Sequence, residues 1–321
     1  MGNRAIVICC MLLALLSACG GSSVPRAVPG DVVTSPAEAP SGVSFTDDLG
    51  RAVTVAEPPR RVAALIGSFA DIWCLAGGKD TLVAAAGDAW TQFDLGLGPE
   101  VADLGAIKEI NTEALFAAQP DLVIASSNTA ADVALLDLLE EAGLTAAYFN
   151  VSSFPDYLRM LDICTQLTGC PENYERYGAA VQAQVDAARD RADGSAPTVL
   201  YVRATGSSCK VKNSRDSVLG EMLADLGCVN IADSAAGLLE NLSLEVIVEQ
   251  DPDFIFAVVQ GSDPSKAEAL LDATLLSHPA WASLTAVREG RFHIMDQKLY
   301  NLKPNANWGI AYEQLANILY P

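Results

Sequence analysis

Two stretches of the chain carry basic side chains and no acidic ones, a pattern that suggests binding chemistry. The first runs from Ser195 to Arg215 and the second from Gln297 to Tyr312. The whole chain has 40 acidic and 20 basic residues, so these stretches run against its composition. Arginine and lysine form charge-assisted hydrogen bonds to carboxylate or catecholate oxygens. We therefore expect both stretches to line an anion-binding cleft; the alternative is a pair of solvated surface loops.

The residues expected in this cleft lie in loops that follow predicted strands. In doubly wound sheets, ligand contacts come from the loops at the carboxyl ends of strands. Trp90 and Tyr300 are candidate aromatic walls for a flat or bulky ligand. The alternative for either is packing inside a lobe, which suits Trp90 equally well. The predicted ligand-binding residues are Ser68, Phe69, Trp90, Arg203, Lys212, Tyr300 and Lys303.

A second pattern is a phrase that occurs twice, with a glutamate seven residues before a Pro-Asp pair. Glu113 precedes Pro120-Asp121, and Glu245 precedes Pro252-Asp253. Each Pro-Asp opens an unbroken apolar run, which a short helix, a proline stop and a buried strand explain. Two such units suggest two lobes of similar build, each presenting one carboxylate in an equivalent place. The alternative is that helix–turn–strand units simply recur in α/β proteins.

Sequence signals for catalysis or for a direct metal site are missing. His278 and His293 are the only histidines, and no H-E-x-x-H motif or His/Asp cluster accompanies them. The chain has no G-x-S-x-G motif and no phosphate-binding G-x-x-x-x-G-K motif. Ser68 follows a predicted strand but has no convincing histidine partner. We expect a binding protein, not an enzyme, with no cofactor and no direct metal site of its own.

Charge and cysteine content limit the partners further. The formal charge of −20 repels nucleic acid and anionic lipid headgroups. Beyond residue 19 the cysteines show no metal-ligand spacing and are odd in number, so they cannot all pair. We expect mostly buried free thiols, while disulfides among them stay an open possibility. These cysteines are Cys74, Cys164, Cys170, Cys209 and Cys228.

The N-terminal segment predicts export and anchoring. Residues 5–19 are almost wholly apolar but are shorter than the ~20 residues that a membrane-spanning helix needs. Leu16-Ser17-Ala18-Cys19 resembles the bacterial lipobox, which predicts a signal peptide over residues 1–18 and a lipid on Cys19. The alternative is an ordinary signal peptide cut near Ala18. Residues 19–42 are rich in Gly, Pro and Ser and predict a flexible tether.

The remaining chain alternates predicted strands and helices, apart from one helical segment. Residues 43–151 and 196–321 each predict an α/β lobe, and residues 152–195 predict a helical segment that contains a linking spine helix. The fold class that we expect is α/β, with two doubly wound Rossmann-like lobes joined by a single long helix. The predicted strands are Val62–Ile66, Leu82–Ala86, Leu122–Ala125, Thr145–Phe149, Val199–Arg203, Phe254–Val259 and Phe292–Met295.

Taken in order, these features resemble the substrate-binding lipoproteins of ABC importers for iron–siderophore complexes, haem and cobalamin. The resemblance covers Val43 to Pro321 and implies a class III substrate-binding protein, whose lobes move little because one helix joins them. The segments that carry it are Phe45–Arg51, Pro59–Val62, both Glu…Pro-Asp phrases, Cys228–Asp233 and Lys303–Trp308.

The resemblance also implies the partners. In this family one glutamate at the tip of each lobe pairs with an arginine on each half of the permease, and Glu113 and Glu245 match those positions. The expected protein is an extracytoplasmic monomer, lipid-anchored to the bacterial cell membrane, that delivers a ferric siderophore to an ABC permease dimer. Haem and cobalamin remain alternative ligands. A lipid-anchored sensor that reports to a signalling partner is the alternative function.

Overall fold

The structure is a computed structural model that describes residues 42–321 except residues 216, 236, 241 and 262. The predicted signal peptide, Cys19 and the tether up to residue 41 therefore lie outside the described residues. Within the described part of the chain, no helix combines the length and apolar character needed to cross a membrane.

The first lobe is built on a parallel sheet with the strand order β5-β4-β3-β6-β7. Its strands are β3 (Val62–Ala64), β4 (Leu82–Ala85), β5 (Ala102–Asp103), β6 (Leu122–Ser126) and β7 (Thr145–Phe149). Its helices are α1 (Gly67–Leu75), α2 (Asp88–Thr91), α3 (Thr112–Ala117), α4 (Ala130–Val133) and α5 (Leu136–Glu141). An antiparallel hairpin of β1 (Val43–Thr46) and β2 (Ala52–Val55) precedes the sheet.

The second lobe is built on a parallel sheet with the order β10-β8-β11-β12, to which β9 adds an antiparallel strand beside β8. Its strands are β8 (Thr198–Ala204), β9 (Cys209–Lys212), β10 (Val229–Asn230), β11 (Phe254–Val259) and β12 (Phe292–Met295). Its helices are α9 (Val218–Asp225), α10 (Gly237–Glu240), α11 (Leu244–Gln250), α12 (Pro264–Leu271), α13 (Thr285–Arg288) and α14 (Gln297–Tyr300).

The central strands β6 and β11 are buried on both faces of their sheets, which explains why they are almost wholly apolar. In β6, Leu122 and Ile124 join one hydrophobic cluster while Val123 and Ala125 join another. In β11 the faces divide in the same way, because Phe256 lies in one cluster and its neighbours Ile255 and Ala257 lie in a second. The predicted class of two doubly wound α/β lobes is confirmed.

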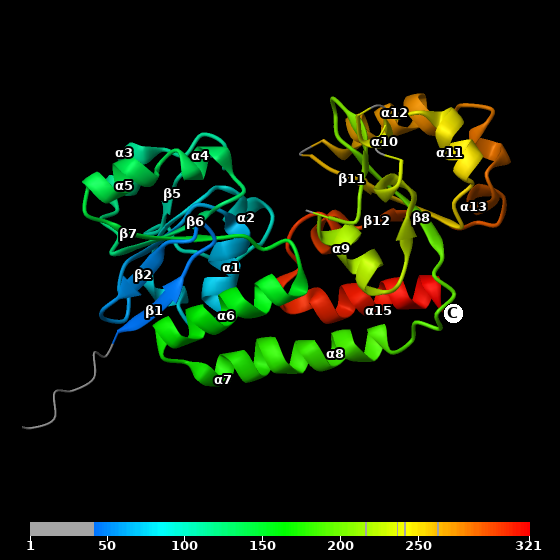
Figure 1. Ribbon diagram of the computed structural model, residues 1–321. Coiled ribbons are helices and arrows are strands. Elements are labelled where there is room, and N and C mark those ends of the chain that lie inside the picture. Colours follow the sequence, from blue (N-terminus) through cyan, green and yellow to red (C-terminus); the bar gives the residue numbers. More distant parts are fainter. Residues whose placement is uncertain (1–41, 216, 236, 241, 262) are drawn as a thin grey trace, which may run out of the picture. The chain divides into compact units, whose positions relative to one another are not determined.

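A helical layer accompanies the two lobes (Figure 1). Helix α6 (Phe154–Thr168) begins at a capping box of Ser153 and Asp156 and ends at Gly169 with φ 73°, a left-handed conformation that glycine adopts without strain. The next run comprises α7 (Pro171–Tyr174), a π-helical turn (Glu175–Ala179) and α8 (Ala180–Arg189), and α8 packs against the last helix, α15 (Trp308–Leu319).

The spine helix is less regular than its sequence predicts. Val181 and Val185 are buried, as the apolar stripe predicts, but the turn before them is a π-helix. The carbonyl of Tyr177 in this turn accepts a hydrogen bond of 2.8 Å from the Tyr157 hydroxyl of α6. A π-helical turn leaves backbone groups without regular helical partners, and here a side chain from the adjacent helix binds one of them.

Candidate ligand-binding site

A cavity of about 230 Å³ lies where the carboxyl ends of strands from both lobes meet. We call it the inter-lobe cavity. The first lobe contributes residues that end or follow β6 and β7, and the second contributes β8, the start of α9 and the loop after α14. The lining residues are Ser126, Asn128, Thr129, Val151, Ser152, Tyr201, Arg203, Ser217, Val218, Asn301 and Lys303.

The chemistry of this lining is cationic and rich in neutral hydrogen-bonding groups. Arg203 and Lys303 supply positive charge, while the remaining polar residues carry hydroxyl or amide groups. None of the described lining residues carries a carboxylate, although the chain as a whole has twice as many acids as bases. This arrangement favours a ligand that presents several anionic oxygens.

The two acid-free stretches meet at this cavity. Arg203 comes from β8 in the first stretch, and Asn301 and Lys303 follow α14 in the second. The Nη1 atom of Arg203 lies 3.5 Å from the Oδ1 atom of Asn301, at the long limit of a hydrogen bond. The guanidinium is half-buried, so some of its donors stay available to a ligand.

Lys303 is flanked by a carboxylate of the first lobe. Burial lowers the pKa of the Lys303 ammonium, and the nearby Asp88 carboxylate opposes that effect. Burial also raises the pKa of Asp88, while the backbone N–H of Gly67, 2.8 Å from its Oδ1 atom, acts in the opposite direction. Asp88 thus accepts a hydrogen bond at the start of α1 and also influences the pKa of a lysine that lines the cavity.

Lys212 does not line the inter-lobe cavity but shares a sheet face with residues that do. In the antiparallel pair β8–β9, Tyr201 lies opposite Lys212 and Arg203 lies opposite Lys210. Directly opposed residues point to the same face of a sheet. The expectation of an irregular loop at this point was wrong, because Cys209–Lys212 forms strand β9 and thereby fixes both lysines on that face.

Three predicted ligand contacts are corrected by burial. Phe69 is fully buried and meets Phe149 edge-on with ring centroids 6.4 Å apart. Ser68 is only 2% exposed and does not line the cavity. Tyr300 is 1% exposed, and its hydroxyl lies 3.0 Å from the Ala311 carbonyl, so the side chain is a packing element and not an aromatic wall.

Trp90 is half-buried, packs against the main hydrophobic cluster and is absent from the cavity lining, which supports its alternative role in packing. The lining residues Asn128 and Asn301 were not among the predicted ligand-binding residues, because their neutral amides carry no compositional signal. Tyr201 of β8 and Ser217, the residue that precedes α9, also lay outside the predicted set.

A buried carboxyl lies behind the first lobe's side of the cavity. Asp132 is fully buried, and its Oδ2 atom accepts a hydrogen bond of 2.8 Å from the backbone N–H of Ser126. Its Oδ1 atom is buried without a partner among the described residues. Burial raises the pKa of this carboxyl to about 7, and the charge of Asp88 acts in the same direction.

The two glutamates of the repeated phrase occupy matching positions. Glu113 lies in the first turn of α3, whose N-cap residue Asn111 accepts a hydrogen bond of 3.0 Å from the Ala114 N–H. Glu245 lies in the first turn of α11, where Ser243 caps in the same way. Both side chains are exposed, and neither takes part in a salt bridge within the described part of the chain.

The repeated phrase also ends alike in both lobes. Gln119 and Asp251, which precede the prolines, both have positive φ values, 48° and 39°. The carboxylate of Asp121 accepts the Arg60 backbone N–H at 2.9 Å, just before β3. The carboxylate of Asp253 accepts the Thr198 N–H at 2.8 Å, at the start of β8. The two units therefore share their geometry as well as their sequence.

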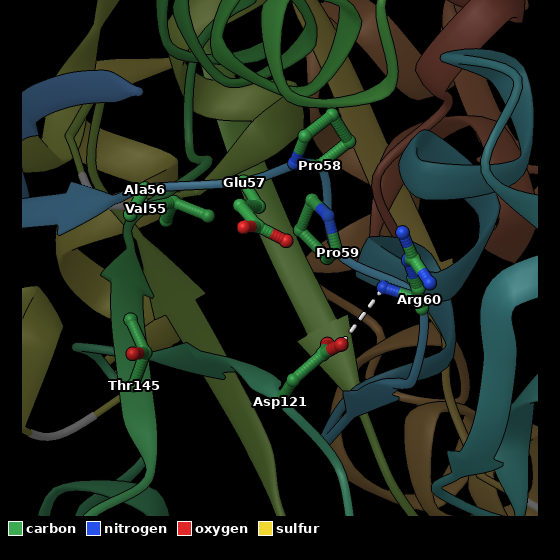
Figure 2. Close-up of a pocket in the computed structure, with 8 residues that line it drawn as sticks. All are labelled: Val55, Ala56, Glu57, Pro58, Pro59, Arg60, Asp121 and Thr145. Atoms are coloured by element: carbon green, nitrogen blue, oxygen red, sulfur yellow. Dashed lines mark hydrogen bonds between the residues drawn. The ribbon is translucent and has the colours of Figure 1, made fainter. Parts of the chain in front are cut away.

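A second cavity, of about 320 Å³, lies at the opposite ends of the first lobe's strands (Figure 2). It is lined by the Val55–Arg60 segment, Asp121 and Thr145, and the figure marks the hydrogen bond from Arg60 to Asp121. Ligands of doubly wound sheets bind at the carboxyl ends of the strands, so this cavity is not the candidate site.

No group of His, Cys, Asp and Glu that could hold a metal ion occurs among the described residues. The five cysteines of the described chain are all free thiols, and Cys164 and Cys228 are buried. Burial raises the pKa of the Cys228 thiol to about 12.

Comparison with known proteins agrees with this architecture. A family model described as "Periplasmic binding protein" matches residues 62–299. The ferric-anguibactin-binding protein FatB of Vibrio anguillarum is 23% identical over 309 residues, which cover 92% of this chain and 90% of FatB.

Two solved structures share the fold at similar identity. The apo periplasmic haem-binding protein RhuT from Roseiflexus sp. RS-1 is 23% identical with a TM-score of 0.65, covering 81% of this chain and 98% of RhuT. The vitamin B12-binding protein BtuF of Vibrio cholerae is 19% identical with a TM-score of 0.64, covering 82% of this chain and 97% of BtuF.

The chain belongs to the periplasmic binding protein family, and its fold is that of the class III members. Proteins of this family are substrate-binding proteins and not enzymes, and they deliver a ligand to an ABC permease. Family membership also places the protein outside the cytoplasm.

Proposed function

We propose that this protein captures a ferric siderophore in the inter-lobe cavity and delivers it to an ABC permease. The observation that carries the proposal is the lining itself, which combines Arg203 and Lys303 with neutral donors and has no carboxylate among its described residues. Anionic oxygens of a chelate match such a lining. The relative FatB, which is named for binding ferric anguibactin, supports an iron complex as the ligand.

The size of the cavity limits what it can hold. Pockets for drug-sized ligands are typically ~300–1,000 Å³, and the inter-lobe cavity is about 230 Å³. A whole chelate therefore requires the lobes to separate further, or else only its charged part enters. Either case keeps Arg203 and Lys303 in contact with the ligand.

Haem is the second candidate, because RhuT is a haem-binding protein with this fold. Protein-bound haem iron is usually held by His, Met, Cys or Tyr. Tyr201 is the one such residue in the described lining, and it is only 1% exposed. Burial also raises the pKa of its hydroxyl to about 12, which opposes the phenolate form that binds iron. Cobalamin has less anionic character and makes less use of the two cations.

Binding measured by intrinsic tryptophan quenching tests the ligand class. The panel contains ferric catecholate, ferric hydroxamate and ferric hydroxycarboxylate siderophores together with haem and cobalamin. We expect an anionic ferric chelate to bind most tightly. Tight binding of haem or cobalamin, with no response to any ferric chelate, would overturn the assignment.

Docking to the permease is the second part of the proposal. Glu113 and Glu245 are exposed at matching positions of two similar lobes, as a binding protein that meets a two-fold permease requires. Each carboxylate forms a salt bridge to a permease arginine in the complex. A lipid-anchored sensor has no evident need for such a pair, so loss of uptake on their removal separates the two functions.

Anchoring is the third part, and it rests on Leu16-Ser17-Ala18-Cys19 alone. Cys19 carries the lipid that holds the protein at the membrane. The variant Cys19→Ser should appear in the soluble extracytoplasmic fraction after cell fractionation. Continued membrane association of that variant would mean that the protein is held in another way.

A further inference from the structure

The loop of residues 301–305 brings two polar groups to the inter-lobe cavity, and hydrogen bonds to other helices fix the chain at both ends of the loop. Asn301 and Lys303 line the cavity. Before the loop, the Tyr300 hydroxyl lies 3.0 Å from the Ala311 carbonyl and 3.1 Å from the Gln314 side chain of α15. After Lys303 come Pro304 and Asn305, both buried. The groups that hold Asn305 belong to the other lobe.

Asn305 is bound to helix α1 of the first lobe. Its Nδ2 atom donates to the Ser68 carbonyl at 2.9 Å and to the Asp71 carboxylate at 2.7 Å, although 237 positions separate Asn305 from Ser68. The side chain is fully buried, so water cannot replace these hydrogen bonds if they are lost. Their loss would leave buried polar groups without partners, which is unfavourable. Its φ of 51° is left-handed, and asparagine tolerates that conformation better than most residues.

A charge interaction reinforces the same connection. Against the lowering effect of burial, the charge of Asp88 raises the pKa of Lys303, and the Oδ1 atom of Asp88 accepts the N–H of Gly67, the first residue of α1. The loop is therefore held by α1 at Asn305, and Lys303 lies within the electrostatic influence of a carboxylate that binds α1. Within the described residues, the loop's side-chain bond to the second sheet is the long contact between Asn301 and Arg203, at 3.5 Å.

We propose that Asn305 is a positioning residue that ties the 301–305 loop to α1 and thereby holds Lys303 in the inter-lobe cavity. The loop follows the second sheet in sequence but moves with the first lobe when the lobes separate. The two cations of the cavity then belong to different moving bodies, because Arg203 lies on β8. An anion that binds both of them draws the lobes together. Only this last step rests on the proposed function.

The test follows the environment of Lys303 without a ligand. Reductive methylation of the full chain with ¹³C-formaldehyde labels its lysines for NMR, and loss of a peak in Lys303→Arg assigns Lys303. The variants are Asn305→Gly, which keeps the left-handed backbone accessible, and Asp71→Asn, which removes the charged acceptor and keeps its shape. Asn230→Ala is the matched control, because Asn230 is 1% exposed and donates to the Lys212 carbonyl within the second lobe.

In the wild type we expect Lys303 to be methylated slowly and to titrate below the ordinary value of about 10.4 for lysine. In both variants we expect faster methylation and a Lys303 pKa closer to that value, because the released loop exposes the ammonium to water. Asn230→Ala should lose stability without either change. If Asn305→Gly is folded and Lys303 behaves as in the wild type, the positioning role is wrong.

The proposed function fails in a different way. If the Lys303 signal moves as expected but Lys303→Gln binds the ferric chelate like the wild type, the loop is positioned by Asn305 and Lys303 does not contact the ligand. If Lys303→Gln weakens binding while Asn305→Gly leaves the Lys303 signal unchanged, Lys303 contacts the ligand but is positioned by other residues.

Discussion

The two lobes are alike where they present their glutamates and differ where they face the inter-lobe cavity. Glu113 and Glu245 occupy the same turn of equivalent helices, each with a side-chain N-cap. At the cavity, residues 43–151 contribute neutral side chains such as those of Ser126, Asn128 and Thr129, while both cations come from residues 196–321, Arg203 on β8 and Lys303 in the loop that is bound to α1. Matching exposed carboxylates suit a partner with two similar halves, whereas a small ligand imposes no such symmetry.

A finer difference concerns how each glutamate-bearing helix is held at its other end. At α3 the Arg61 guanidinium donates to the carbonyls of Gln119, at 2.9 Å, and Ala118. At α11 the Asp251 carboxylate accepts from the Thr285 N–H at 2.7 Å, at the start of α13. The end of α3 is thus bound to the segment that precedes β3, whereas the end of α11 is bound to α13. The same sequence phrase therefore produces one local unit with two different attachments.

The largest expected effect on ligand binding tests the chemical difference between the two sides of the cavity. Arg203→Ala should weaken binding of the ferric chelate by ~1.5–3 kcal/mol, because it removes charge-assisted hydrogen bonds in a partly buried site. Asn128→Ala, on the neutral side, should cost only ~0.5–1.5 kcal/mol. Tryptophan quenching measures both affinities. Equal losses would mean that charge does not distinguish the two lobes, and no loss in either would mean that the ligand binds elsewhere.

The next effect concerns the carboxyl behind the neutral side. The pKa of Asp132 is raised to about 7 by burial, so the folded state holds its proton more tightly than the unfolded chain does. The contribution of the Asp132 proton to the free energy of unfolding should be complete below about pH 4. It should fall between about pH 4 and 7, with a slope of at most ~1.4 kcal/mol per pH unit. Asp132→Asn should remove this decline in urea unfolding measured across that range. An unchanged pH profile in the variant would place the decline on other groups.

A smaller effect tests the attachment of α3. Arg61→Ala should lower the free energy of unfolding by about 0.5–1 kcal/mol, because two carbonyls at the end of α3 lose an exposed donor. Arg60→Ala removes the same charge next in sequence and is the matched control, because only the backbone of Arg60 forms the hydrogen bond that fixes this segment. We expect its unfolding free energy to stay within ~0.5 kcal/mol of the wild type. Equal losses in both variants would show that charge, and not capping, is responsible.

The last prediction has the smallest expected energy for each residue changed, and it tests whether the two glutamates act alike in the two lobes. An exposed ion pair typically contributes ~0.2–1 kcal/mol, and more where an interface excludes water. Glu113→Ala and Glu245→Ala should each lower uptake modestly, and the double variant should lower it far more. Chelate binding by the isolated protein should not change. A parallel fall in binding would assign the carboxylates to the ligand site, and unchanged uptake would make the repeat purely architectural.

Much of the fold could be predicted from the sequence because its signals are local. Apolar runs bounded by Pro, Gly and polar residues predicted Thr145–Phe149, Phe254–Val259 and Phe292–Met295 with the bounds that the structure has. Strand β9 was missed, because Lys210 and Lys212 make its segment look like a solvated loop. The π-helical turn in the spine was missed as well, since it depends on packing against α6 and not on periodicity.

For the candidate site, the sequence by itself determined which residue types were available. The absence of acids beside Arg203 and Lys303 and the twofold Glu…Pro-Asp phrase are properties of composition and spacing. Only the tertiary structure decided which side chains reach the inter-lobe cavity. Tyr300 directly precedes the lining residue Asn301 but turns into the core, Phe69 is buried in α1, and Asn305 binds a helix 237 positions away. The physical reason is that inward or outward orientation depends on which distant surface packs against a segment, and local sequence patterns carry no record of that surface.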